Sequence, residues 1–212
     1  MHRRFNIALL VLPLIAATAA AQTPGTTAPP AQAAQAAPAD PATLRVAPSG
    51  RVRTELTLSA PRVQGQPAPA AQKIWIDYGQ PHARGRTVLG GLIPYDSVYR
   101  FGANAATTFH TDVDLNIGET AVPRGDYTLF LVASRTGAKL VVSRQTGQWG
   151  TMYDASRDLA RIDMTTRTLA EPVESFTISL VPAATQDGAP ASGRLVAAWG
   201  TAEFSVPWRV GR

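Results

Sequence analysis

The chain has 212 residues, a formal net charge of +5 and no cysteine. The lack of thiols excludes a disulfide framework, thiolate chemistry and a cysteine-linked lipid anchor, so stability must come from an ordinary hydrophobic core, which this length can supply. The lysines and arginines are scattered and no basic run is interleaved with aromatic residues, so the composition predicts no nucleic-acid partner.

The N-terminal residues predict export. Arg3 and Arg4 precede an apolar run from Ile7 to Ala17, and Ala19–Ala21 provides the small residues that a signal peptidase reads before Gln22. Spanning a bilayer takes about 20 apolar residues, so this run is too short for a membrane anchor. We therefore expect residues 1–21 to be a signal peptide. The mature chain is expected to be periplasmic or secreted, with no transmembrane segment.

Residues 22–48 differ in composition from the rest of the chain. They are mostly Ala, Pro, Gln and Thr, and Asp40 is their only charge before Arg45. Such a segment has too little apolar bulk to offset the entropy lost on ordering. We predict a disordered, Ala/Pro-rich linker here, followed by one folded domain over residues 49–212.

From Arg51 onward, apolar and polar residues alternate with a period of two, which is typical of strands with one buried face. The alternating segments are 74–78, 109–117, 176–180, 195–199 and 204–208, and turn residues such as Gly118, Gly137, Gly147 and Gly200 separate them. Tyr127–Ala133 and Leu140–Val142 are apolar on both faces and predict central strands. Only Asp154–Leu159 is expected to be helical, over one or two turns. The pattern predicts an all-β domain, a single antiparallel β-sandwich of about eight to ten strands, with a barrel as second choice.

Several motifs in the segment after Tyr78 follow one another in a specific order. They are Tyr78-Gly-Gln-Pro81, Gly91-Leu-Ile-Pro-Tyr95, Arg100-Phe-Gly-Ala-Asn104, Pro123-Arg-Gly-Asp-Tyr127 and Gln148-Trp-Gly150. Their order resembles that of the bacterial exported family known as domain of unknown function 2911, over essentially residues 46–212. The resemblance implies an all-β, signal-bearing periplasmic or envelope protein. It carries over no catalytic residue and no cofactor.

The Arg84–Thr108 loop is the leading candidate for a ligand site, because long ordered connections are where scaffolds place binding groups. Arg86 and Arg100 could grip a carboxylate or phosphate, and Asn104 adds a donor and an acceptor. Tyr95 and Tyr99 could stack on a sugar or another ring. The alternative is a structural cross-over in which these side chains satisfy buried backbone groups.

His110, Asp112 and Asp114 form a weaker candidate, for a metal ion. At alternate positions of one strand their side chains share a face, and an imidazole with two carboxylates suits zinc or manganese. The simpler interpretation is a solvated strand face, because Phe109, Val113 and Leu115 alternate with them. We expect no metal and no other cofactor.

No nucleophile, zinc or phosphate-binding motif of a known enzyme class occurs in the chain, which favours a non-enzymatic protein. The leading hypothesis is a β-sandwich that binds a small molecule, a glycan or an envelope protein. The alternatives are a hydrolase acting on an envelope polymer, for which Asp96, Glu171 and Glu174 are the available carboxylates, and a structural or assembly module. Trp149 and Tyr153 could form an aromatic platform for a glycan, or could be packing at the edge of the sandwich.

Overall fold

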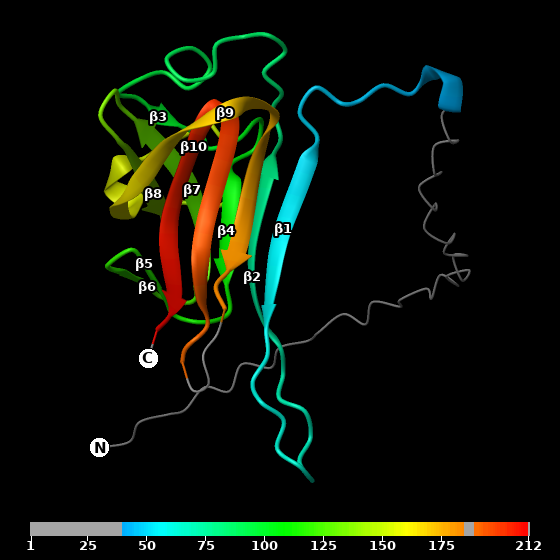
Figure 1. Cartoon of the computed structure of the whole chain (residues 1–212), viewed down its shortest axis with the longest axis vertical. Helices are drawn as coiled ribbons and strands as arrows, with labels where there is room; N and C mark the ends of the chain where they lie inside the picture. Colours follow the sequence, from blue (N-terminus) through cyan, green and yellow to red (C-terminus); the bar gives the residue numbers. More distant parts are fainter. Residues whose placement is uncertain (1–39, 185–188, 212) are drawn as a thin grey trace, which may run out of the picture. The chain divides into compact units, whose positions relative to one another are not determined.

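The computed structural model describes residues 40–184 and 189–211 (Figure 1). The predicted signal peptide, and the predicted linker as far as residue 39, lie outside this part of the chain. Contacts divide the chain into two units, Met1–Leu44 and Arg45–Arg212. In the first unit, Pro41–Thr43 form one 3-10 turn, whose Ala42 amide donates to the side chain of Asp40 over 3.0 Å. Among the described residues, no helix has the length and apolar character needed to cross a membrane.

The second unit is all-β, as the alternating pattern predicts. Its strands are β1 (Arg51–Leu58), β2 (Gln72–Gly79), β3 (Val98–Tyr99), β4 (Thr107–Thr111), β5 (Leu115–Ile117), β6 (Thr120–Val122), β7 (Gly125–Ala133), β8 (Ala138–Ser143), β9 (Asp158–Pro182) and β10 (Ser192–Val210). They form one antiparallel sheet of ten strands in the order β1-β2-β4-β7-β8-β9-β10-β5-β6, and β3 pairs with β7. The sheet is not closed, so the barrel alternative is wrong.

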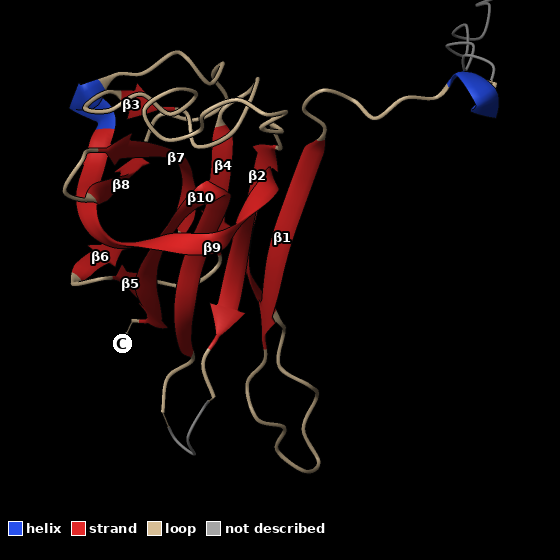
Figure 2. Cartoon of the chain, turned by 45° about the horizontal axis from the view of Figure 1, so that its top comes forward, coloured by secondary structure: helices blue, strands red, loops and turns tan. Residues whose placement is uncertain are grey.

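Two long strands fold this sheet back on itself. The first part of β9 pairs with β8, and its last part pairs with the beginning of β10. In between, β9 arches along β10: Thr165–Thr168 pair with Ala202–Ser205, and the register shifts at Gly200, whose φ is +55° and whose Cα partner is Val173. Figure 1 and Figure 2 show β9 as this arch, with the two arms of β10 beneath it. The two halves of the sheet therefore face each other across a shared core.

An aromatic cluster joins the two halves. Phe176 of β9 lies edge-on to Tyr78 of β2, Phe101 of the β3–β4 loop and Trp199 of β10, with ring centroids 5.4–5.8 Å apart. The Tyr78 hydroxyl accepts a hydrogen bond of 3.0 Å from the amide of Ile178, and burial raises the pKa of this hydroxyl. Burying these large rings supplies much of the hydrophobic stabilisation of the domain.

A second, smaller apolar layer covers the outside of β7 and β8. Phe130 and Val141 are register partners and are almost fully buried, yet they do not belong to the main core cluster. The segment between β8 and β9 covers them, and Tyr153 of this segment lies edge-on to Phe130 at 4.9 Å. This covering explains why β7 and β8 are apolar on both faces. The predicted helix at Asp154–Leu159 is a single 3-10 turn at Ala155–Arg157, because Asp158 already begins β9.

Candidate functional site

The loop between β2 and β4 is held in an unusual backbone conformation. Its residues Arg84, Asp96, Phe101 and Asn104 are the non-glycine residues with positive φ in the described part of the chain, at +49° to +61°. Residues other than glycine adopt this region only when the surrounding structure imposes it. The loop is anchored at its start by the amide of Ala83, which donates to the Glu174 carbonyl over 2.8 Å. It is therefore an ordered element of the domain.

Two of the predicted ligand residues bind the loop's own backbone. Arg86 donates from Nε to the Ala83 carbonyl at 2.9 Å and from Nη2 to the His82 carbonyl at 2.8 Å. Tyr99 is buried and donates from its hydroxyl to the Gly102 carbonyl at 2.8 Å, and burial strongly raises its pKa. These contacts favour the structural interpretation for Arg86 and Tyr99.

Tyr95 and Asn104 are also engaged. The guanidinium of Arg135 lies 4.9 Å from the centre of the Tyr95 ring, and this ring packs closely against Gly90. The side chain of Asn104 donates from Nδ2 to the Ser49 carbonyl at 3.4 Å, and the backbone carbonyl of Asn104 accepts from the Gly150 amide at 2.9 Å. Asn104 thus connects the loop to the β8–β9 segment.

Arg100 lies in a hollow of about 290 Å³ between the connection from β2 to β4, which includes β3, and the β8–β9 segment. Three residues of the loop form one wall, three residues of the β8–β9 segment form the other, and the nearly buried Phe130 forms the base. The first wall is Leu92, Pro94 and Val98, with Tyr99 beside them, and the second is Gly150, Thr151 and Tyr153.

The guanidinium of Arg100 keeps donors that the protein does not use. Arg100 is half-buried, and its Nε donates to the Gly102 carbonyl over 3.3 Å. In residues 40–184 and 189–211, no carboxylate lies within ion-pair distance of it, and no group accepts from its two terminal nitrogens. A half-buried arginine without a counter-charge creates a positive potential in the hollow, because burial reduces screening by water.

Tyr153 on the opposite wall belongs to a fixed polar network. Its hydroxyl donates to Asp158 Oδ2 at 2.5 Å and accepts from Arg161 Nη2 at 2.6 Å, and Arg161 Nε reaches the same carboxylate at 3.0 Å. Burial, together with the bond to Asp158, raises the pKa of Tyr153, so its hydroxyl stays protonated. Asp158 Oδ1 is buried and has no partner among the described residues.

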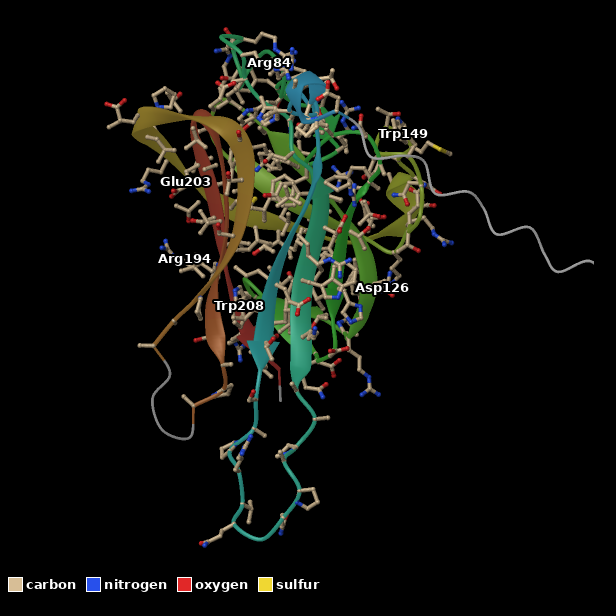
Figure 3. The ribbon with its side chains drawn as sticks, turned by 90° about the vertical axis from the view of Figure 1, so that its right-hand side faces the viewer. Arg84, Asp126, Trp149, Arg194, Glu203 and Trp208 are labelled. Carbon is tan, nitrogen blue, oxygen red and sulfur yellow. The ribbon has the colours of Figure 1, made fainter. Side chains whose placement is uncertain are left out.

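Two large apolar side chains flank the second wall and face solvent. Trp149 is 53% exposed and Met152 is 58% exposed, an unusual state for residues of this size. Figure 3 shows Trp149 at the surface, toward the end of the domain that also carries Arg84. Sequence reasoning singled out Trp149 and Tyr153 but missed Phe130, Leu92 and Val98, since only the folded chain brings these three together.

The predicted metal residues do not come together as one ligand set. His110 Nδ1 contacts Asp126 Oδ1 at 2.7 Å, and its Nε2 contacts Asp112 Oδ1 at 3.0 Å. Asp114 is used elsewhere, accepting from the Arg124 amide at 2.8 Å. The part of the chain that the structure describes contains no group of three or more His, Asp or Glu side chains able to hold a metal ion.

His110 instead bridges two carboxylates on the solvent-facing side of the sheet. Partial burial on its own lowers the pKa of His110, but hydrogen bonds with Asp126 and Asp112 outweigh it and raise the pKa above its ordinary value. The hydrogen bond between His110 and Asp112 also lowers the pKa of Asp112, and a second hydrogen bond, from the Lys73 amide, lowers it further. The ring also stacks on Trp75 at 5.0 Å. This arrangement is that of a partly exposed histidine hydrogen-bonded to two carboxylates.

A larger hollow, of about 510 Å³, lies on the outer face of β9, β10 and β5. It is bounded by Arg194 and Arg209, which are exposed, and by Val181 and Pro207. Figure 3 shows Arg194 further down the sheet than Trp149. The smaller hollow is the better candidate, because its arginine is half-buried and two separate loop segments converge on it.

The family of the chain is clear from comparison with known proteins. A family model described as "Protein of unknown function (DUF2911)" matches residues 60–208. The chain belongs to this family. Neither the curated proteins nor the solved structures gave a significant match. The DUF2911 match covers every strand that lines the Arg100 hollow, and the hollow itself.

Proposed function

We propose that this DUF2911 protein is an exported binding protein for a small ligand that combines an anionic group with an apolar body. The observation that carries the proposal is Arg100, which is half-buried in the 290 Å³ hollow with its terminal donors unused by the described residues. Guanidinium groups bind carboxylates and phosphates with paired, charge-assisted hydrogen bonds.

The rest of the lining supports an apolar body for the ligand. Leu92 and Val98 offer an apolar surface beside Arg100, and the buried Phe130 lines the same hollow. Trp149 and Met152, next in the chain to the lining residues Gly150 and Thr151, expose further apolar side chains. Small-molecule sites are typically apolar with a few placed polar groups, and this hollow is near the lower end of the size range of about 300–1,000 Å³. The Thr151 side chain lines the hollow and is available for orientation, whereas the Tyr153 hydroxyl is engaged by Asp158 and Arg161.

Binding is better supported than hydrolysis. The hollow is lined by an arginine, two tyrosines and a threonine, but by no histidine, aspartate or glutamate among the described residues. A hydrolase of an envelope polymer would need two carboxylates, or a nucleophile with a base, at the same place.

The proposal is tested with two ligands that differ only in charge, 3-phenylpropionate and its neutral amide. By isothermal calorimetry the acid should bind the wild-type protein more tightly than the amide. Arg100→Gln should weaken binding of the acid about tenfold or more, the cost of a lost charge-assisted hydrogen bond, and leave the amide unchanged.

The control is Arg124→Gln, which removes the same charge at a residue outside the hollow. It should bind both compounds as the wild type does. Equal binding of acid and amide, or undiminished binding of the acid by Arg100→Gln, would refute an anion site at Arg100.

Export is the second element of this proposal, and it rests on Arg3, Arg4, the apolar run to Ala17 and the small residues at 19–21. Protein recovered from the periplasm or medium of expressing cells should have lost residues 1–21. Intact-mass measurement should find a chain that begins at Gln22. An unprocessed chain retained in the cytoplasm would contradict export.

A further inference from the structure

Strand β1 is an open edge of the sheet. It pairs with β2 over its full length, from Arg51 opposite Gly79 to Leu58 opposite Gln72, without a register shift. Its other side has no strand partner in the described part of the chain, and Figure 1 and Figure 2 both show it at the margin of the domain. Edge strands are usually protected by charged side chains, a proline, a bulge, short length or an inward-facing charge. Across its eight residues β1 has no proline, bulge or inward-facing charge, and its charged residues, Arg51, Arg53 and Glu55, are of both signs.

The two faces of β1 differ in chemistry. Arg51, Arg53, Glu55 and Thr57 are exposed on the outer face. Val52, Leu56 and Leu58 face the core and pack against it, but they remain only partly buried. An additional strand beside β1 would cover these apolar side chains and would use the unpaired backbone groups of the edge.

We propose that a second copy of this chain pairs with β1, strand against antiparallel strand, about a two-fold axis at Thr54. Residues directly opposite in an antiparallel pair share a face, so the axis must pass through a residue. At Thr54 it places Val52 opposite Leu56 of the second copy on the core face. It places Arg53 opposite Glu55 of the second copy on the outer face, and symmetry makes each of these pairs twice.

Neighbouring registers are less favourable. An axis at Glu55 brings two glutamates face to face, and an axis at Arg53 does the same with two arginines. Like charges directly opposite each other destabilise a strand pair, whereas opposite charges stabilise it. Charge complementarity therefore selects Thr54 over both.

The charges on the adjoining strand extend this complementarity. Asp77 of β2 contacts Arg53 at 3.4 Å, and Lys73 contacts Glu55 at 2.7 Å. Across the proposed interface, the side chains would run Asp77, Arg53, Glu55 of the second copy and Lys73 of the second copy. The signs alternate along this row, so neither central residue must give up its present partner.

Charge exchange at β1 tests the proposal with the mature protein. Sedimentation velocity of the wild type over about 1–200 µM should show a concentration-dependent monomer–dimer equilibrium, the range expected for a strand-edge contact. Arg53→Glu and Glu55→Arg should each lower the association constant about tenfold or more, because each turns two attractive pairs into repulsive ones. The double variant R53E/E55R restores opposite charges and should recover most of the wild-type association.

Two controls separate this effect from misfolding and from a general change of charge. Circular dichroism should show that all three variants retain the wild-type β spectrum, and recovery by the double variant excludes simple damage to β1. Arg124→Glu should associate as the wild type does. A wild type that is monomeric at every concentration would overturn the proposal. So would single variants that dimerise normally, a double variant that recovers nothing, or loss of association in Arg124→Glu.

Discussion

Gly150→Ala should abolish most ligand binding at the Arg100 hollow while leaving the domain folded. A Cβ atom at this position would lie 2.5 Å from the Asn104 carbonyl oxygen and 2.8 Å from Arg100 Cδ. Contacts this short force the loop and the β8–β9 segment apart, and both walls of the hollow depend on their spacing. We expect binding of 3-phenylpropionate to weaken about tenfold or more, and the free energy of unfolding to fall by about 1–3 kcal/mol, as is usual for overpacking.

The matched control is Gly137→Ala in the β7–β8 turn, where an added Cβ meets no atom within 4 Å. Its binding should equal that of the wild type, measured by the same calorimetry, and urea unfolding should show little change. If Gly150→Ala bound the acid normally, the close approach of the two segments would not shape a ligand site.

Among the variants proposed for this protein, Phe176→Ala should produce the largest loss of stability. Phe176 is fully buried and contacts Tyr78, Phe101 and Trp199, so it packs against both halves of the sheet and the β3–β4 loop. Truncating a buried phenylalanine costs about 3–5 kcal/mol, because the transfer term and the cavity add. For a domain of this size, the melting temperature should fall by roughly 10 °C.

Val181→Ala on the same strand is the control, since Val181 is 41% exposed. It should change the free energy of unfolding by less than about 0.5 kcal/mol. Equal melting temperatures for the Phe176→Ala protein and the wild type would show that the aromatic cluster does not join the two halves.

The all-β class could be predicted from local pattern, because a two-residue period reports directly which side chains face a core. Residues 74–78 and 109–111 illustrate this, since their apolar members are buried as expected. The course of β9 could not be predicted in the same way. Its exposed central residues show no clean alternation, and its arch along β10 depends on pairing with β8 and β10, which lie far apart in sequence.

The sequence indicated the region of the site and its central Arg100, but not the full set of residues that line it. Arg86 and Arg100 are equivalent as residues in a loop, and only their backbone contacts distinguish an arginine that closes a turn from one that keeps free donors. Phe130 was expected to be buried in a central strand. Its position at the base of a hollow follows from the segment that covers the outer face of β7.

The pairing of β1 and the Arg100 hollow are independent of each other. β1 carries no residue of the hollow, so loss of association in Arg53→Glu should leave binding of the acid unchanged. Failure of either proposal would therefore leave the other standing.

The most direct measurement is NMR chemical-shift perturbation, in which the backbone amide and indole N–H signals of the ¹⁵N-labelled mature protein are followed during titration with 3-phenylpropionate. Our account predicts that the changes gather at residues 92–100, at residues 150–153 and at the indole N–H of Trp149, and that Arg100→Gln removes them. Changes centred instead on Arg194 and Arg209, or no saturable change at all, would contradict a ligand site at Arg100.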